Sequence, residues 1–74
     1  MKRVIEVGKK YRHFKGKIVE VLALAKDSED LRDLVVYKHD DQVWVRDYDV
    51  FISLVDKEKY PTVTQKYRFE EVEE

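Results

Sequence analysis

The most regular alternation of apolar and polar residues lies near the C-terminal end of the chain. Between Pro61 and Glu70, the apolar side chains Val63, Tyr67 and Phe69 alternate with polar ones. A period of two with a single apolar face is typical of an antiparallel strand that covers one side of a core. The residues just before this run are predicted as a loop, because proline cannot donate a hydrogen bond to a central ladder.

Two hairpins are predicted earlier in the chain. The first joins residues 10–14 to residues 18–25 through Lys15-Gly16, where glycine supplies a positive φ. The second joins residues 34–39 to residues 43–46 through a short polar turn. The run 18–25 is apolar at nearly every position, which predicts a strand buried on both faces, although its Leu-Ala-Leu-Ala portion also suits a helix.

The remaining segments are short and complete an all-β pattern. Asp27 and Ser28 can cap a helical turn within a polar stretch, and residues 47–49 predict another such turn. Residues 51–55 predict a further short strand. The expected fold is a small antiparallel SH3-like barrel or curled sheet of about five to six strands. The expected core comprises Leu22, Leu34 or Val35, Val36, Trp44 or its flanking valines, Phe51, Tyr67 and Phe69.

Composition limits the class of protein. The 74 residues make one domain, 43% of them are hydrophobic, and the chain contains no cysteine. Disulfides, zinc-thiolate sites, thiol nucleophiles and iron–sulfur clusters are therefore excluded. The chain has no apolar run near the roughly 20 residues that a membrane span needs, and its N-terminus has no signal-peptide core. We expect a soluble, cytoplasmic protein with no membrane partner.

Charge is distributed unevenly although the net charge is only −1. Residues 1–17 carry seven basic side chains against Glu6 alone, whereas residues 18–74 carry eight basic and fifteen acidic ones. The acidic excess includes a tail at 70–74. A basic segment can steer an anionic partner such as nucleic acid. The competing interpretation is that the basic hairpin packs near the acidic tail, so that the two fields largely cancel.

Motifs for catalysis and cofactor binding are missing. The chain has no phosphate-binding glycine loop, zinc-protease helix, nucleophile elbow or calcium loop. His13 and His39 are too few to build a metal site, and neither serine has a histidine nearby in the sequence. We therefore expect no catalytic residue, no metal and no cofactor.

The aromatic and basic residues of the second hairpin have two interpretations. Trp44 and Arg46 share one face of their strand, and Val43 and Val45 share the other. If the valines point inward, Trp44 and Arg46 are presented outward to stack on a ligand or pair with an anion. In the opposite registry Trp44 is a core residue and Arg46 lies at the rim. Tyr37 is on the partner strand.

Several short blocks together resemble a bacterial family of unknown function, numbered 1653. They are Tyr11-Arg12-His13-Phe14-Lys15-Gly16, Val21-Leu22, Ser28-Glu29, Leu34-Val35-Val36-Tyr37, Trp44-Val45-Arg46, Phe51 and Arg68-Phe69. The resemblance covers residues 8–70 of a single domain that comprises 1–74. The chain departs from the family pattern at Ala23, Asp27 and Asp47, which stand where glycine, histidine and proline are usual, and in a shorter second hairpin. The resemblance implies no activity, and Asp27 argues against essential chemistry by a histidine at that position.

The residues predicted to line a site are the polar and aromatic members of these blocks, namely Arg12, His13, Ser28, Glu29, Tyr37, Trp44 and Arg46. They point to a non-enzymatic module that binds nucleic acid, a nucleotide or a peptide, as a monomer or weak homodimer. One alternative is an enzyme or accessory domain acting on a phosphorylated small molecule, with His13 and Glu29 as acid and base. Another is a structural protein that adds a strand from a partner to an exposed sheet edge.

Overall fold

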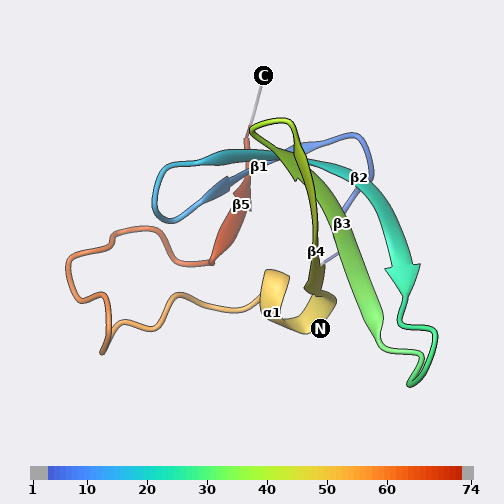
Figure 1. The fold of residues 1–74 in the computed structure, drawn as a ribbon. Coiled ribbons are helices and arrows are strands. Elements are labelled where there is room, and N and C mark those ends of the chain that lie inside the picture. The colour runs from blue at the N-terminus through green and yellow to red at the C-terminus, as the bar shows by residue number, and fades with distance from the viewer. Residues whose placement is uncertain (1–3, 73–74) are drawn as a thin grey trace.

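The computed structural model describes residues 4–72, which form one antiparallel sheet and one short helix (Figure 1). The five strands pair in the spatial order β4-β3-β2-β1-β5. The sheet curls over the helix α1 and does not close, because β4 and β5 remain its two edges (Figure 1). The fold is therefore an all-β curled sheet. The elements in chain order are β1 Lys10–His13, β2 Ile18–Lys26, β3 Asp33–His39, β4 Gln42–Asp47, α1 Tyr48–Phe51 and β5 Phe69–Glu71.

Both predicted hairpins are confirmed. In the first, Gly16 has a φ of 98°, which glycine adopts without steric cost, and its N–H donates to the carbonyl of His13. In the second, Asp40 and Asp41 have φ values of 52° and 62°. Positive φ at both central residues defines a type I′ turn, whose twist matches that of the flanking strands. This turn sets the register of β3 against β4.

A break in the register of β2 corrects two predictions. The pairing with β3 shifts between Val21 and Ala23, which takes the intervening Leu22 out of the ladder. Leu22 is 39% exposed and is not a core residue. The strand is also not buried on both faces. Val19 and Val21 face the core, whereas no other described element covers the outer side of β2.

The core is built around two stacked phenylalanine rings. Phe51 of α1 and Phe69 of β5 are 0% and 1% exposed, and their ring centroids lie 4.0 Å apart with nearly parallel planes. Both were predicted as core residues, and so was Val35, which is fully buried. The stack joins the two ends of the long segment between the helix and the last strand. The other buried residues are Ile5, Tyr11, Val19, Val21, Tyr37 and Val55.

Trp44 is not a core residue, because β4 is an edge strand. It pairs with Tyr37 and, like Arg46, projects on the inner side of the sheet, yet it is 49% exposed. The flanking Val43 and Val45 are more exposed still, so the prediction that either Trp44 or these valines are buried is wrong. The alternative in which Trp44 and Arg46 point away from the core is also wrong. Both side chains flank the core on the concave side.

The segment between α1 and β5 contains less strand than predicted. Residues 51–55 contribute the end of α1 and one isolated bridge, Leu54 with Tyr67, and regular pairing resumes only at Phe69. Side chains satisfy the backbone carbonyls that a ladder would use. The ammonium group of Lys57 donates to the carbonyls of Val63 and Gln65, at 2.5 and 2.9 Å. This segment is therefore an irregular loop held by side chains.

The predicted helical turn near residue 47 is confirmed as α1. The Asp47 carboxylate accepts a hydrogen bond from the Asp49 N–H at 2.9 Å, which caps the helix. Within residues 4–72, no helix has the length and apolar character required to cross a membrane.

Candidate functional site

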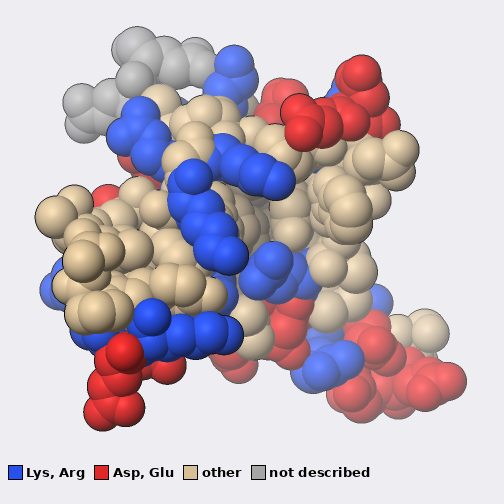
Figure 2. All heavy atoms as spheres, turned by 60° about the vertical axis from the view of Figure 1, so that its left-hand side comes forward, with Lys and Arg blue, Asp and Glu red and all other residues tan. Residues whose placement is uncertain are grey.

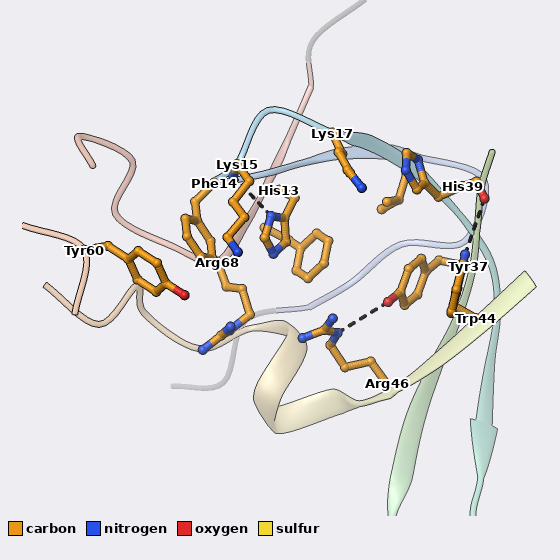
Figure 3. A pocket seen from close by; sticks show the side chains of 12 residues that line it. His13, Phe14, Lys15, Lys17, Tyr37, His39, Trp44, Arg46, Tyr60 and Arg68 are labelled. Carbon is orange, nitrogen blue, oxygen red and sulfur yellow. Dashed lines mark hydrogen bonds between the residues drawn. The ribbon is translucent and has the colours of Figure 1, made fainter. Parts of the chain in front are cut away.

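The concave side of the sheet holds a pocket of about 400 Å³ (Figures 2 and 3). Its walls come from the β1–β2 hairpin, the inner faces of β3 and β4, and the loop before β5. Among the described residues that line it, none is acidic. Most of the lining residues are cationic or aromatic. The cationic ones are Lys15, Lys17, Arg46 and Arg68, and the aromatic ones besides histidine are Phe14, Tyr37, Trp44, Tyr60 and Phe69.

Arg46 is held in place through one side of its guanidinium group. Its Nε donates to the hydroxyl of Tyr37 at 3.4 Å, and the guanidinium carbon lies 5.5 Å from the ring centroid of Phe69. Both anchoring residues are buried. The two terminal nitrogens project into the pocket (Figure 3). An arginine fixed in this way presents a preorganised pair of donors to an oxyanion.

Arg68 is anchored in the same manner from the opposite wall. Its Nε donates to the hydroxyl of Ser53 at 3.2 Å, and that hydroxyl donates to the carbonyl of Val50 at 2.6 Å. The guanidinium carbon lies 5.9 Å from the ring centroid of Phe14. Figure 3 shows the guanidinium groups of Arg68 and Arg46 at the same edge of the pocket, with a gap between them.

The four pocket cations form no ion pair with any carboxylate of residues 4–72. Ion pairs of basic residues with carboxylates do form elsewhere in the described chain. Lys9 lies 3.7 Å from Glu71, Lys26 lies 2.7 Å from Asp33, and Arg32 lies within 4 Å of three aspartates. Of the described residues in the acidic tail, Glu71 therefore pairs with Lys9, and neither Glu70 nor Glu71 pairs with a pocket cation. Figure 2 shows the resulting gathering of Lys and Arg around the hollow.

His13 responds to the field of these cations. Burial of the ring, and then the positive charges of Arg46, Arg68, Lys15 and Lys17, lower the pKa of His13 to about 4. Its Nδ1 accepts a hydrogen bond from the Lys15 N–H at 3.1 Å. At neutral pH the ring is therefore neutral and carries its proton on Nε2. His13 adds a hydrogen-bond donor to the pocket and no charge.

The aromatic side chains form two separate surfaces in the pocket. Phe14 and Tyr60 lie together at one end, with ring centroids 4.9 Å apart. Trp44 lies at the other end beside Tyr37, and its indole N–H donates to the carbonyl of His39 at 3.3 Å. Figure 3 shows the guanidinium groups of Arg46 and Arg68 and the ammonium group of Lys17 between these two ends.

The family model for a protein of unknown function, DUF1653, matches residues 9–71. This range contains all five strands, the helix and every residue that lines the pocket. The chain belongs to the DUF1653 family. No curated protein and no solved structure matches it.

The structure brings together four of the seven residues predicted for a site in this DUF1653 domain, namely His13, Tyr37, Trp44 and Arg46. Arg12 lies on the opposite face of β1 from His13 and Tyr11, and its side chain is exposed. It does not line the pocket. The pocket thus uses one face of the strand, as the period of two requires.

Ser28 and Glu29 lie in the exposed turn between β2 and β3, at the other end of the sheet from the pocket (Figure 1). The turn is organised by Asp27, whose carboxylate accepts hydrogen bonds from the N–H groups of Glu29 and Asp30. These bonds lower the pKa of Asp27. Glu29 and His13 therefore do not face a common pocket. Within residues 4–72, no cluster of His, Asp and Glu could hold a metal ion.

The sequence alone did not place two pocket residues in a site, namely the loop residue Tyr60 and Arg68, which directly precedes β5. Arg68 had a usable signal, because it stands in one of the blocks shared with the family and precedes the core residue Phe69. Lys15 and Lys17 had another, since they belong to the basic N-terminal segment. Nothing in the sequence around Tyr60 indicates a place in the pocket, because only the path of an irregular loop brings this residue to Phe14.

Proposed function

We propose that this domain is a non-enzymatic binding module whose concave pocket takes an anionic ligand that carries an aromatic ring, as nucleic acids and nucleotides do. One observation carries the proposal. Four cations without a carboxylate partner among residues 4–72 surround a pocket with aromatic walls, in a chain that has more acidic than basic residues. A positive field that the fold leaves uncompensated is a means of attracting an anion.

The geometry favours phosphate as the anionic group. Arg46 and Arg68 are each anchored through Nε and offer their terminal nitrogens from opposite walls, which suits the several oxygens of a phosphate. The aromatic surfaces at the two ends supply faces on which a base can stack. A peptide would engage neither feature as fully, unless it were rich in carboxylates.

The pocket offers little for acid–base catalysis. Its lining contains two imidazoles, those of His13 and His39, and Glu29, the candidate partner of His13, lies in a remote turn. General acid–base chemistry requires both groups within hydrogen-bond reach of the same substrate atoms. This separation supports a binding role over the alternative of an enzyme that acts on a phosphorylated small molecule.

The proposal is tested by titrating a single-stranded oligonucleotide and measuring the salt dependence of the dissociation constant. Release of counterions by four cations corresponds to a log–log slope of about −3 for a single strand. Affinity should therefore fall about 50-fold between roughly 50 and 200 mM salt. The absence of binding at low salt would refute the proposal.

Two matched variants locate the binding surface. Arg46→Gln removes a pocket guanidinium, and Arg12→Gln makes the same charge change on the outer face of β1. Loss of a charge-assisted contact should weaken binding at least about 10-fold for Arg46→Gln, whereas Arg12→Gln should stay within about twofold. Equal losses in both variants would mean that the ligand responds to overall charge and does not occupy the pocket.

A further inference from the structure

The two aromatic surfaces of the pocket point to a ligand with two bases. Phe14 and Tyr60 form one surface, and the ammonium group of Lys15 lies 5.9 and 5.6 Å from the centroids of their rings. Trp44 forms the other surface at the opposite end, where it is half-exposed although it faces the concave side. A half-exposed indole beside a cationic hollow is available for stacking.

Each aromatic surface is held in position by the fold. The Tyr60 N–H donates to the carbonyl of Asp56, and the Val63 N–H donates to the carbonyl of Tyr60, so Tyr60 lies within two consecutive loop turns. The indole N–H of Trp44 is bonded to a backbone carbonyl at the β3–β4 turn. Because hydrogen bonds fix the backbone of Tyr60 and the indole edge of Trp44, both residues need less further ordering when a base stacks on them.

Between the two surfaces lie the guanidinium groups of Arg46 and Arg68. This order along the pocket is aromatic, cationic and aromatic. A single nucleotide would place its base on one surface and its phosphate at the arginines, and would leave the other surface empty. A chain of two nucleotides matches the order, with a base at each end and the linking phosphate in the middle.

We infer that the pocket takes two successive nucleotides of a single strand, with one base on Phe14 and Tyr60, the next base on Trp44, and the phosphate that joins them between Arg46 and Arg68. This rests on the proposed function and specifies its ligand. The strand must be unpaired, since the bases of a duplex are stacked on one another and do not offer their faces to side chains.

The inference is tested with uridine 5′-monophosphate, the dinucleotide UpU and the pentanucleotide U5, each titrated into the protein at low salt. Binding is followed by NMR through the indole N–H signal and the backbone amides. UpU should bind roughly 10-fold more tightly than the mononucleotide, because it stacks a second base. The mononucleotide carries more negative charge than UpU, so charge alone predicts the reverse order. The gain in affinity for each nucleotide added between UpU and U5 should be smaller than the gain from the mononucleotide to UpU.

Single variants separate the two surfaces. Tyr60→Leu and Trp44→Leu should each lower the affinity for UpU roughly 10-fold and leave the mononucleotide within about threefold, because it can still use the remaining surface. Tyr67→Leu is the matched control, since Tyr67 lies outside the pocket, and should leave both affinities unchanged. Backbone amide spectra of each variant report whether the fold is retained.

Several outcomes would overturn the inference. Equal affinities for UpU and the mononucleotide, or equal losses for both ligands in the two variants, would mean that one base site accounts for binding and would leave the proposed function standing. A stable RNA hairpin with nearly all of its bases paired that binds as tightly as U5 would show that stacking on unpaired bases plays no role. No binding of any of these ligands would refute the proposed function itself.

Discussion

Truncation of Phe69 tests whether the last strand belongs to the core. In Phe69→Ala the side chain that stacks on Phe51 at 4.0 Å is lost, together with contacts to Tyr37 and His13 at 5.9 and 4.9 Å. Removal of a fully buried phenylalanine costs about 3–5 kcal/mol. A domain of 74 residues has a free energy of unfolding of roughly 4–11 kcal/mol. We therefore expect the variant to lose a large part of its stability.

The assay is urea denaturation followed by the fluorescence of Trp44, the single tryptophan of the chain. Leu54→Ala is the control, since this leucine is exposed, and its free energy of unfolding should change by only about 0.5 kcal/mol. If Phe69→Ala does not fold at all, the milder Phe69→Leu should fold with a reduced midpoint. If Phe69→Ala and Leu54→Ala unfolded at the same urea concentration, the conclusion that the phenylalanine stack is central to the core would be refuted.

Two further predictions concern the pocket histidine and the first hairpin. Burial, and then the surrounding cations, lower the pKa of His13 to about 4. A bound phosphate offsets the charge of these cations, so the pKa should rise on binding, and affinity should increase as the pH falls through the higher, bound-state value. NMR titration of the imidazole with and without ligand measures this, and an unchanged pKa would place the phosphate elsewhere. Gly16→Ala should cost about 1–2 kcal/mol, because φ is 98° there although no atom lies within 4 Å of the added methyl group. If Gly16→Ala melted at the same temperature as the unchanged protein, the prediction that alanine is strained in this turn would be wrong.

The local sequence pattern was sufficient to predict the two hairpins, because the preferences of turn and strand residues act over a few neighbouring positions. Glycine at residue 16 and two aspartates at residues 40 and 41 tolerate positive φ, and these positions are where the chain reverses. The alternation after Pro61 predicted a longer strand than the observed β5, which begins only at Phe69, for a reason that is not local. Side chains of Lys57 and Gln65 satisfy backbone carbonyls there, so the chain can run as a loop.

Burial depended on information that no short window contains. Leu22 and Trp44 have the composition of core residues, yet one leaves the ladder at a register shift and the other lies on an edge strand. Both outcomes follow from the order of strands in an open sheet whose outer face is uncovered. A closed barrel, which the same strand pattern allows, would have enclosed β4 and its tryptophan.

The sequence by itself determined that this is a small all-β domain without cysteine chemistry, with a basic N-terminal hairpin and with His13, Tyr37, Trp44 and Arg46 among its candidate binding residues. Only the tertiary structure decided which of the described basic residues form ion pairs and which lie beside aromatic rings. Lys9 meets Glu71 because β1 and β5 are neighbours, whereas Arg46 and Arg68 meet across the concave face, 22 positions apart in the chain. Ion pairing and stacking act over a few ångströms in space, so the folded path of the chain, and not its local pattern, assembles the pocket.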